Sequence, residues 1–154
     1  MPEAGRAMPR KPATVVREVR ADGIAAPPDA TWSDCLLVGR EVVMSGVTAR
    51  RVDGKPVGGD SLKGQTRACF ERIATLLEGA GGSLANVYKL VIYVADITRK
   101  DEINAARAKM FAPLFPCSTL IEVKGFAFPD LIVEIDAFAN LDIDLQASVS
   151  RHGH

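Results

Sequence analysis

Histidine is nearly absent from this chain of 154 residues. The two that occur, His152 and His154, lie in the polar C-terminal stretch SVSRHGH, so the predicted folded body has none. Histidine is the usual proton carrier in nucleophilic catalysis, and its absence excludes Ser-His-Asp and Cys-His arrangements unless the tail folds back. We therefore expect any catalysis in the body to depend on carboxylates, hydroxyls, arginines and backbone groups.

Cysteine is also scarce, and the motifs that bind metals or nucleotides are missing. Cys35, Cys69 and Cys117 are an odd number at wide spacings, which fits neither a disulfide framework nor a zinc site. The chain contains no CxxC, HExxH, GxGxxG or GxxxxGK[ST] pattern. We predict no metal and no cofactor, and a reducing, cytoplasmic compartment.

The chain has neither an excess of one charge nor a long apolar run. Its 19 basic and 19 acidic residues cancel, so no summed field attracts nucleic acid or an anionic membrane. No stretch approaches the ~20 apolar residues of a membrane helix, and the N-terminus lacks the apolar core of a secretory signal. We predict a soluble protein whose partners include neither nucleic acid nor membrane.

Apolar spacing and turn residues divide the chain into strands and helices. Strands are predicted at residues 14–20, 35–38, 42–47, 87–96, 117–127 and 131–141, the second and third as a hairpin. One helix is predicted at residues 62–77, closed by GAGG, and another in DITRKDEINAARAKMFAPLF, closed by Pro113 and Pro116. The predicted order is βββαβαββ. This order predicts an α/β protein in the broad sense, with a mixed sheet (α+β).

This order predicts one domain with a mixed sheet. Two helices that fall between strand groups can cover one face of a single sheet, which leaves the other face in need of a partner. Several strands are apolar on both faces, so an oligomer is expected. We expect a flexible leader at residues 1–13, the domain at 14–145 and a flexible tail at 146–154.

A few polar residues are candidates for chemistry. Glu134, in LIVEIDAFA, either faces solvent from an alternating strand or lines a half-buried cleft, where desolvation would raise its pKa and let it handle a proton. Arg50 and Arg51 are either solvated loop residues or an anion-binding fork. Cys117 is either a half-buried packing residue or a reactive thiol.

Four segments in order carry a family resemblance. They are WSDCLLVGREVVMSG, then QTRACFERIATLLEGAGGSLANVYKLVIYVAD, then INAARAKMF, and last FPCSTLIEV with VEIDAFA. Together, from about Trp32 to Ala139, they resemble the Rid family of reactive intermediate deaminases, also called YjgF and once labelled translation inhibitors or L-PSP endoribonucleases. The resemblance implies a chorismate-mutase-like fold and a homotrimer with ligand clefts between subunits.

The resemblance also implies an activity and a set of site residues. Known members hydrolyse enamines and imines, especially 2-aminoacrylate, to a 2-keto acid and ammonia, and others are similar to 2-aminomuconate deaminases. Glu134 matches the family glutamate that would activate water. The residues that match cleft positions or lie beside the substrate are Trp32, Ser45, Asn104, and the backbone near Ser118 and Thr119.

One position departs from the family pattern. The substrate-binding arginine of the family's P-A-R-S segment falls on Ser118, because the segment here is P-C-S-T. Losing one charge-assisted contact weakens carboxylate binding by roughly 1.5 to 3 kcal/mol. A bound carboxylate would then need its charge from Arg50, Arg51 or Lys124. The family's next cysteine is replaced by Leu120, and Cys117 is shifted by three.

Three functions follow as hypotheses. The first is a cofactor-free deaminase of an enamine, an imine or an aminomuconate-like metabolite, with Glu134 and Asn104 in the cleft. The second is a homotrimer that binds a small molecule without turnover, in which Ser118 and Cys117 mark the cleft. The third, ribonuclease activity, is disfavoured because balanced charge gives little affinity for phosphate.

Overall fold

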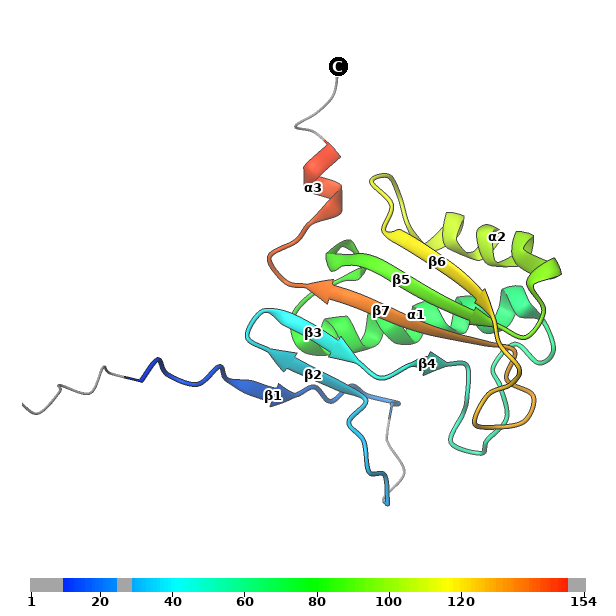
Figure 1. The fold of residues 1–154 in the computed structure, drawn as a ribbon, viewed down its shortest axis with the longest axis horizontal. Helices are drawn as coiled ribbons and strands as arrows, with labels where there is room; N and C mark the ends of the chain where they lie inside the picture. The colour runs from blue at the N-terminus through cyan, green and yellow to red at the C-terminus, as the bar shows by residue number, and fades with distance from the viewer. Residues whose placement is uncertain (1–9, 25–28, 150–154) are drawn as a thin grey trace, which may run out of the picture.

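The computed structural model describes residues 10–24 and 29–149, whose strands form one mixed sheet (Figure 1). The sheet has seven strands in the order β1-β2-β3-β7-β5-β6, and β4 also pairs with β7. All pairs are antiparallel except β5 with β6, so β6 is a parallel edge strand. The strands are β1 (Val16–Glu18), β2 (Cys35–Val38), β3 (Glu41–Met44), β4 (Val47–Thr48), β5 (Val87–Val94), β6 (Cys117–Glu122) and β7 (Val133–Asn140).

The predicted hairpin is confirmed, but its second strand is interrupted. Cys35 of β2 pairs with Met44 of β3, and β3 then pairs with the second half of β7. After Ser45 and Gly46 the chain resumes as β4, which pairs with the first half of β7. The stretch predicted as one strand is therefore two strands separated by a Ser-Gly break beside β7.

Two long helices cover one face of the sheet, as predicted (Figure 1). α1 (Leu62–Ala80) starts where the Ser61 side chain accepts a hydrogen bond from the Gly64 N–H at 3.0 Å. It ends at Gly81, whose φ of 91° is left-handed and suits glycine. Short 3₁₀ turns, η1 (Leu84–Asn86) and η2 (Ile97–Arg99), flank β5, and η2 leads into α2 (Lys100–Met110).

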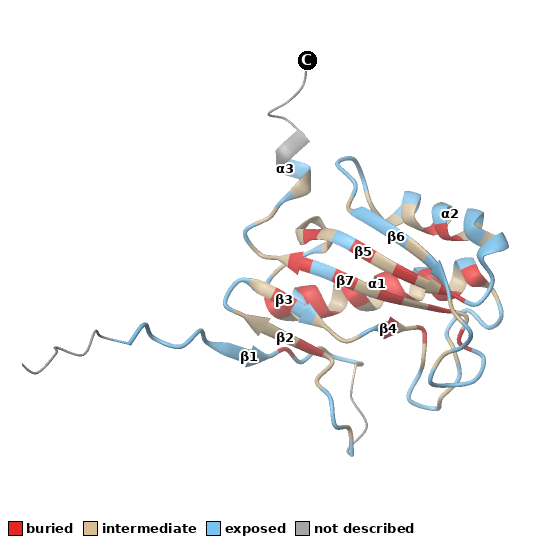
Figure 2. Cartoon of the chain, viewed as in Figure 1, coloured by how far each residue is buried: buried red, intermediate tan, exposed pale blue. Residues whose placement is uncertain are grey.

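The core lies between this sheet face and the helices. Side chains alternate along a strand, so one set of β7 residues is buried against α1 and the other faces away from the helices (Figure 2). The buried set is Val133, Ile135, Ala137 and Ala139. We call the side that carries the other set, Glu134, Asp136, Phe138 and Asn140, the open face.

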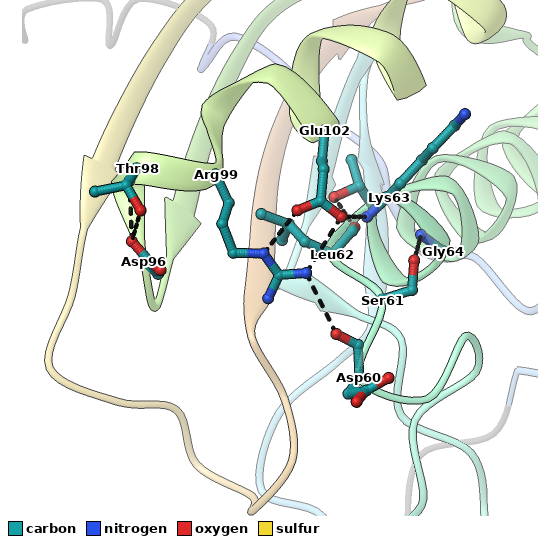
Figure 3. Close-up of polar contacts among 10 residues, drawn as sticks. Asp60, Ser61, Leu62, Lys63, Gly64, Asp96, Thr98, Arg99 and Glu102 are labelled. Atoms are coloured by element: carbon teal, nitrogen blue, oxygen red, sulfur yellow. Dashed lines mark hydrogen bonds and ion pairs between the residues drawn. The ribbon is translucent and has the colours of Figure 1, made fainter.

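A polar cluster joins the N-termini of α1 and α2 (Figure 3). Arg99 Nε donates to Glu102 Oε2 at 2.6 Å, and Glu102 Oε1 accepts the Lys63 backbone N–H at 3.4 Å. The Arg99 guanidinium also reaches the Asp60 carbonyl at 3.4 Å, and its bond to Glu102 lowers the pKa of that carboxyl. A carboxylate at a helix N-terminus is electrostatically favourable, so the cluster fixes where α2 lies relative to α1.

The C-terminal part packs against the end of α2. α3 (Leu145–Val149) begins near Ala112, whose carbonyl accepts a hydrogen bond from Gln146 Nε2 at 3.1 Å. The first residues of the segment expected to be a tail are therefore helical, and both histidines lie outside the described residues. Within the described ranges, none of the helices combines the length and apolarity that crossing a bilayer requires.

Candidate functional site

Glu134 occupies the middle of the open face. On β7 it lies beside Thr48 of β4 and Tyr93 of β5, its partners in the strand register. Its side chain is half-buried, and none of the described residues forms a hydrogen bond or an ion pair with its carboxylate. Burial, and then the neighbouring Asp136 charge, raise the pKa of Glu134 above its usual range. A half-buried carboxylate with unoccupied oxygens can hold a water molecule and accept its proton.

The break between β3 and β4 makes room for this side chain. A methyl group at Gly46 would stand 2.9 Å from Cδ and 3.1 Å from Cγ of Glu134, closer than side chains normally approach. Gly46 is not in the left-handed region, so its lack of a side chain matters for space and not for backbone conformation. The break thus positions backbone groups directly under the carboxyl group of Glu134.

The neighbouring carboxylate is already engaged. Tyr93 Oη donates a hydrogen bond to Asp136 Oδ2 at 2.8 Å, and this bond raises the pKa of Tyr93. Asp136 and Glu134 are two residues apart on one strand and so share the open face. The two carboxylates therefore have different roles available to them: Asp136 is occupied by Tyr93, while Glu134 is available for a ligand.

Two other predicted site residues share this face. The register aligns Thr119 of β6 with Val91 and Asp136, and Cys117 of β6 with Lys89. Both lie at the edge of the sheet and are exposed. The same face exposes large apolar side chains, among them Val43 (47%), Phe138 (40%) and Ile121 (41%). The open face is thus a partly apolar surface with carboxylates at its middle.

Ser118 lies on the other side of β6. Its partner in the register is Leu90, which is buried, and the next residue but one, Leu120, packs against the core under α2. The Ser118 hydroxyl accepts a hydrogen bond from Arg107 Nη1 at 2.6 Å. Asn104, exposed on α2, is one helical turn before Arg107 and so points to the same side. Ser118 and Asn104 are therefore separated from Glu134 by the sheet.

Ser45 and Trp32 are brought together by a loop contact. Ser45 Oγ donates to the Ser33 carbonyl at 2.7 Å, and the Ser45 N–H donates to the Asp34 carbonyl at 3.0 Å. Trp32 stands at the end of this loop with 49% of its surface exposed. The hydroxyl of Ser45 is therefore used to hold the loop of Trp32 next to the β3–β4 break.

Arg50 and Arg51 belong to a fourth location. They line a cavity of about 640 Å³ between the segment after β4 and α1. The Arg50 guanidinium carbon lies 3.7 Å from the ring centroid of Phe128, and the Arg50 carbonyl accepts a hydrogen bond from Arg72 Nη1 at 2.9 Å. Arg50 Nε is buried without a partner among the described residues. Lys124 is exposed beyond the end of β6.

Gln65 organises the loops at one end of the sheet, although the sequence reading did not single it out. This side chain of α1 is fully buried. Its Nε2 donates to the carbonyls of Gly59 at 2.7 Å and Asp130 at 2.8 Å, and its Oε1 accepts the Ile132 N–H at 3.1 Å. A polar residue on the apolar face of a predicted helix was the available signal. Gln65 fixes the loop that leads into β7, and hence the position of the first residues of the strand that carries Glu134.

Arg107 was also missed, and no local pattern marks it. Its contact with Ser118 depends on how α2 packs against the sheet edge, which residue spacing alone does not specify.

The described residues contain no group of three His, Cys, Asp or Glu side chains that could hold a metal ion. Within one chain, the predicted site residues divide among the open face, the loop of Trp32 and Ser45 beside the β3–β4 break, the helix side of β6 and the Arg50 cavity.

Known proteins share this sequence and fold. A sequence model of the family described as Endoribonuclease L-PSP matches residues 23–141. A RutC family protein from Pyrococcus horikoshii is 30% identical over 125 residues, which are 80% of this chain and 98% of the relative. A solved structure of a protein of unknown function from Pseudomonas aeruginosa is 46% identical with a TM-score of 0.78, over 86% of this chain and 96% of that chain. A YjgF/YER057c/UK114 family member from Mycobacterium tuberculosis is 32% identical with a TM-score of 0.70, over 82% and 99%.

Proposed function

The chain belongs to the Endoribonuclease L-PSP family, which includes the YjgF and Rid proteins, and on this premise we propose that it hydrolyses a small imine or enamine to a carbonyl compound and ammonia. The observation that carries the proposal is the state of Glu134. Its carboxylate is half-buried, has a raised pKa and has no partner among the described residues. These properties suit a group that takes a proton from water and later returns it.

The chemistry requires little beyond this group. The carbon of a protonated imine is electrophilic, so a positioned water molecule can attack it. Glu134 accepts one proton of that water as its oxygen bonds to the imine carbon, giving a carbinolamine. The protonated Glu134 then donates its proton to the nitrogen. The C–N bond breaks as the hydroxyl oxygen forms the carbonyl, and the hydroxyl proton passes through the Glu134 carboxylate to the departing ammonia, which leaves as ammonium. Positioning and one proton carrier supply the main contributions to the rate.

The open face supports the homotrimer that the resemblance implies. Val43, Phe138 and Ile121 expose apolar surface beside the carboxylates, and a second copy packed on this face would bury them. Such packing would also exclude water around Glu134 and raise its pKa further. The active cleft in this proposal is therefore completed by a neighbouring subunit.

The test measures ammonia release from freshly generated imines, 2-aminoacrylate and aminomuconate-like compounds, with the wild-type protein and Glu134→Gln. Gln keeps the size of the side chain and removes the proton acceptor. The matched control is Glu18→Gln, an exposed glutamate on β1, the edge strand at the far end of the sheet from β6. Circular dichroism and light scattering check that all three proteins share one fold and one oligomeric state.

Loss of at least about 100-fold in rate in Glu134→Gln, with Glu18→Gln unchanged, is the expected result for removal of a general base. Turnover that Glu134→Gln leaves intact would remove Glu134 from the mechanism. Absence of turnover with every substrate, combined with saturable binding of a product such as pyruvate, would favour a binding protein over an enzyme. A wild-type protein that is monomeric at assay concentrations would contradict the proposed trimeric cleft.

A further inference from the structure

We propose that Arg107 of α2, held in place by Ser118, binds a carboxylate group of the substrate at the outer edge of β6. This inference rests on the proposed function and names its substrate class: imines and enamines that carry a carboxylate. It also places the charge on a residue other than Arg50, Arg51 and Lys124, which the sequence had offered.

The first argument is the state of the Arg107 side chain. One of its guanidinium N–H groups donates to Ser118 Oγ at 2.6 Å at the protein surface. None of the four ion pairs among the described residues includes Arg107. A guanidinium has five N–H donors, so most remain available on a fixed and unneutralised cation. The buried side chains of Ile103 and Ala106 anchor the helix that carries it.

The second argument is the unpaired edge of β6. The Val123 N–H donates inward to the Val94 carbonyl on β5. Because peptide groups of a parallel strand alternate in direction, the N–H groups of Ser118 and Leu120 point outward, away from β5. β6 ends the sheet, so none of the described strands pairs with these groups. A carboxylate at this edge could accept hydrogen bonds from the Arg107 guanidinium and from the outward backbone N–H groups at the same time. Hydrogen bonds to an ionised group are stronger than those between neutral groups.

The alternative cations are held elsewhere. Arg50 is stacked on Phe128, and it lines, with Arg51, the cavity on the α1 side of β4. Acidic residues Asp22, Asp53 and Glu71 line the same cavity and offset its positive charge. Among these basic residues, Arg107 combines an unneutralised charge, a fixed orientation and neighbouring free amides.

The third argument explains why a second copy is needed. Arg107 and Ser118 lie on the helix side of the sheet, whereas Glu134 lies on the open face with β5 between β6 and β7. One small molecule cannot contact Arg107 and Glu134 of the same chain. In the proposed assembly, the β6 edge of one subunit lies against the open face of the next, so that both groups reach one cleft. We infer that each cleft takes Arg107 from one subunit and Glu134 from another.

The first experiment compares two substrates that differ by one charge. Hydrolysis of the imine of pyruvate and of the neutral imine of methyl pyruvate is measured in wild type, Arg107→Ala and the control Lys109→Ala, which removes a nearby exposed charge from the same helix. Arg107→Ala is expected to raise KM for the charged imine about 10- to 150-fold and to leave the neutral imine unchanged. Equal effects of Arg107→Ala on both imines would overturn the proposal.

The second experiment tests the shared cleft. At a concentration of the charged imine well below KM, Arg107→Ala and Glu134→Gln chains expressed separately are each expected to show strongly reduced hydrolysis, and co-expression is expected to restore part of the rate. Each mixed trimer contains one cleft that joins an intact Arg107 to an intact Glu134 of another chain. Mixed trimers, shown by mass spectrometry to contain both chains, that remain inactive would exclude a cleft divided between subunits.

A third measurement separates this inference from the proposed function. Pyruvate binding, followed by calorimetry, requires no turnover and tests Arg107 alone. Retained binding in Glu134→Gln and lost binding in Arg107→Ala would support the carboxylate site even if no substrate is hydrolysed. Restored binding in the double variant Arg107→Ala/Ser118→Arg would show that the site needs a guanidinium at this edge. Unchanged pyruvate binding in Arg107→Ala would refute the assignment.

Discussion

The Glu134 side chain packs directly over Gly46, whose missing side chain leaves the space that the carboxyl group occupies. The contact joins β7 to the break between β3 and β4, two segments far apart in sequence. It makes the orientation of the proposed proton acceptor depend on a residue with no chemistry of its own. Substitutions at residue 46 should therefore affect activity more than stability.

Gly46→Ala is expected to reduce ammonia release nearly as far as Glu134→Gln. The added methyl group forces Cγ and Cδ of Glu134 to move by several tenths of an ångström or more, and a flexible side chain can do so at little cost in stability. Urea unfolding should change by no more than about 1 kcal/mol. Gly125→Ala is the control, because its methyl group would meet nothing within 4 Å. Full activity in Gly46→Ala would contradict the contact.

The pH dependence of stability should report the raised pKa of Glu134. Unfolded glutamate titrates near pH 4.3, about the value in model peptides, and folding raises this pKa. Between the two pKa values the folded state binds more protons, so wild-type stability falls as the pH rises through them. Glu134→Gln lacks this loss. Its free energy of unfolding relative to wild type should increase from about pH 4 and level off above the folded pKa.

The comparison needs urea titrations of both proteins at one protein concentration across this pH range. Glu18→Gln, which removes an exposed glutamate of β1 that pairs with Arg20, is measured alongside as the control for loss of a surface carboxylate. A difference between Glu134→Gln and wild type that stays constant with pH would mean that burial does not perturb Glu134.

Gln65→Leu should destabilise the fold strongly. Leucine has a similar volume but leaves the carbonyls of Gly59 and Asp130 and the N–H of Ile132 without their partner. Each buried group without a hydrogen bond costs about 1–3 kcal/mol, so a loss of roughly 3 kcal/mol or more is expected in urea unfolding. The same change at the exposed Gln146 should shift stability by about 0.5 kcal/mol. Equal effects at both positions would show that the three contacts of Gln65 contribute little.

Thiol labelling should distinguish the cysteines. Burial raises the pKa of Cys35 to about 11 and that of Cys69 to about 12, so both remain protonated and inaccessible at pH 8. Cys117 is exposed on β6. In Cys117→Ser, Ellman's reagent should find no rapidly reacting thiol in the native protein and two after denaturation. A rapidly reacting native thiol in this variant would show that the core opens around Cys35 of β2 or Cys69 of α1.

Much of the fold was predictable because local signals agreed with the final structure. Apolar spacing at every third or fourth residue defined α1, and GAGG defined its end. β-rich runs located β5 and β7, and the alternation in VEIDAFA indicated that Glu134 and Asp136 point away from the core. The Ser-Gly break was not predictable in this way, because continuous apolar character hides a change of strand.

The site was less predictable because it depends on which side chains of the edge strand β6 point to the helices and which point to the open face. In CSTLIE the alternation is weak, since β6 is exposed on both sides except at Leu120. The helix-side position of Ser118 follows only from the register with Leu90. Arg107 is 11 residues away in sequence, and its contact exists because α2 packs beside the parallel edge strand β6.

The anchoring of Arg107 on α2 has a consequence for how specificity could change. Ile103 and Ala106 set the rotation of α2 against the sheet, and the Arg99–Glu102 pair sets its position along α1. One inserted residue in α2 would turn Arg107 about 100° around the helix axis, away from Ser118. A family member could in this way change the substrates that it accepts through a single insertion in α2, with every residue in contact with the ligand unchanged.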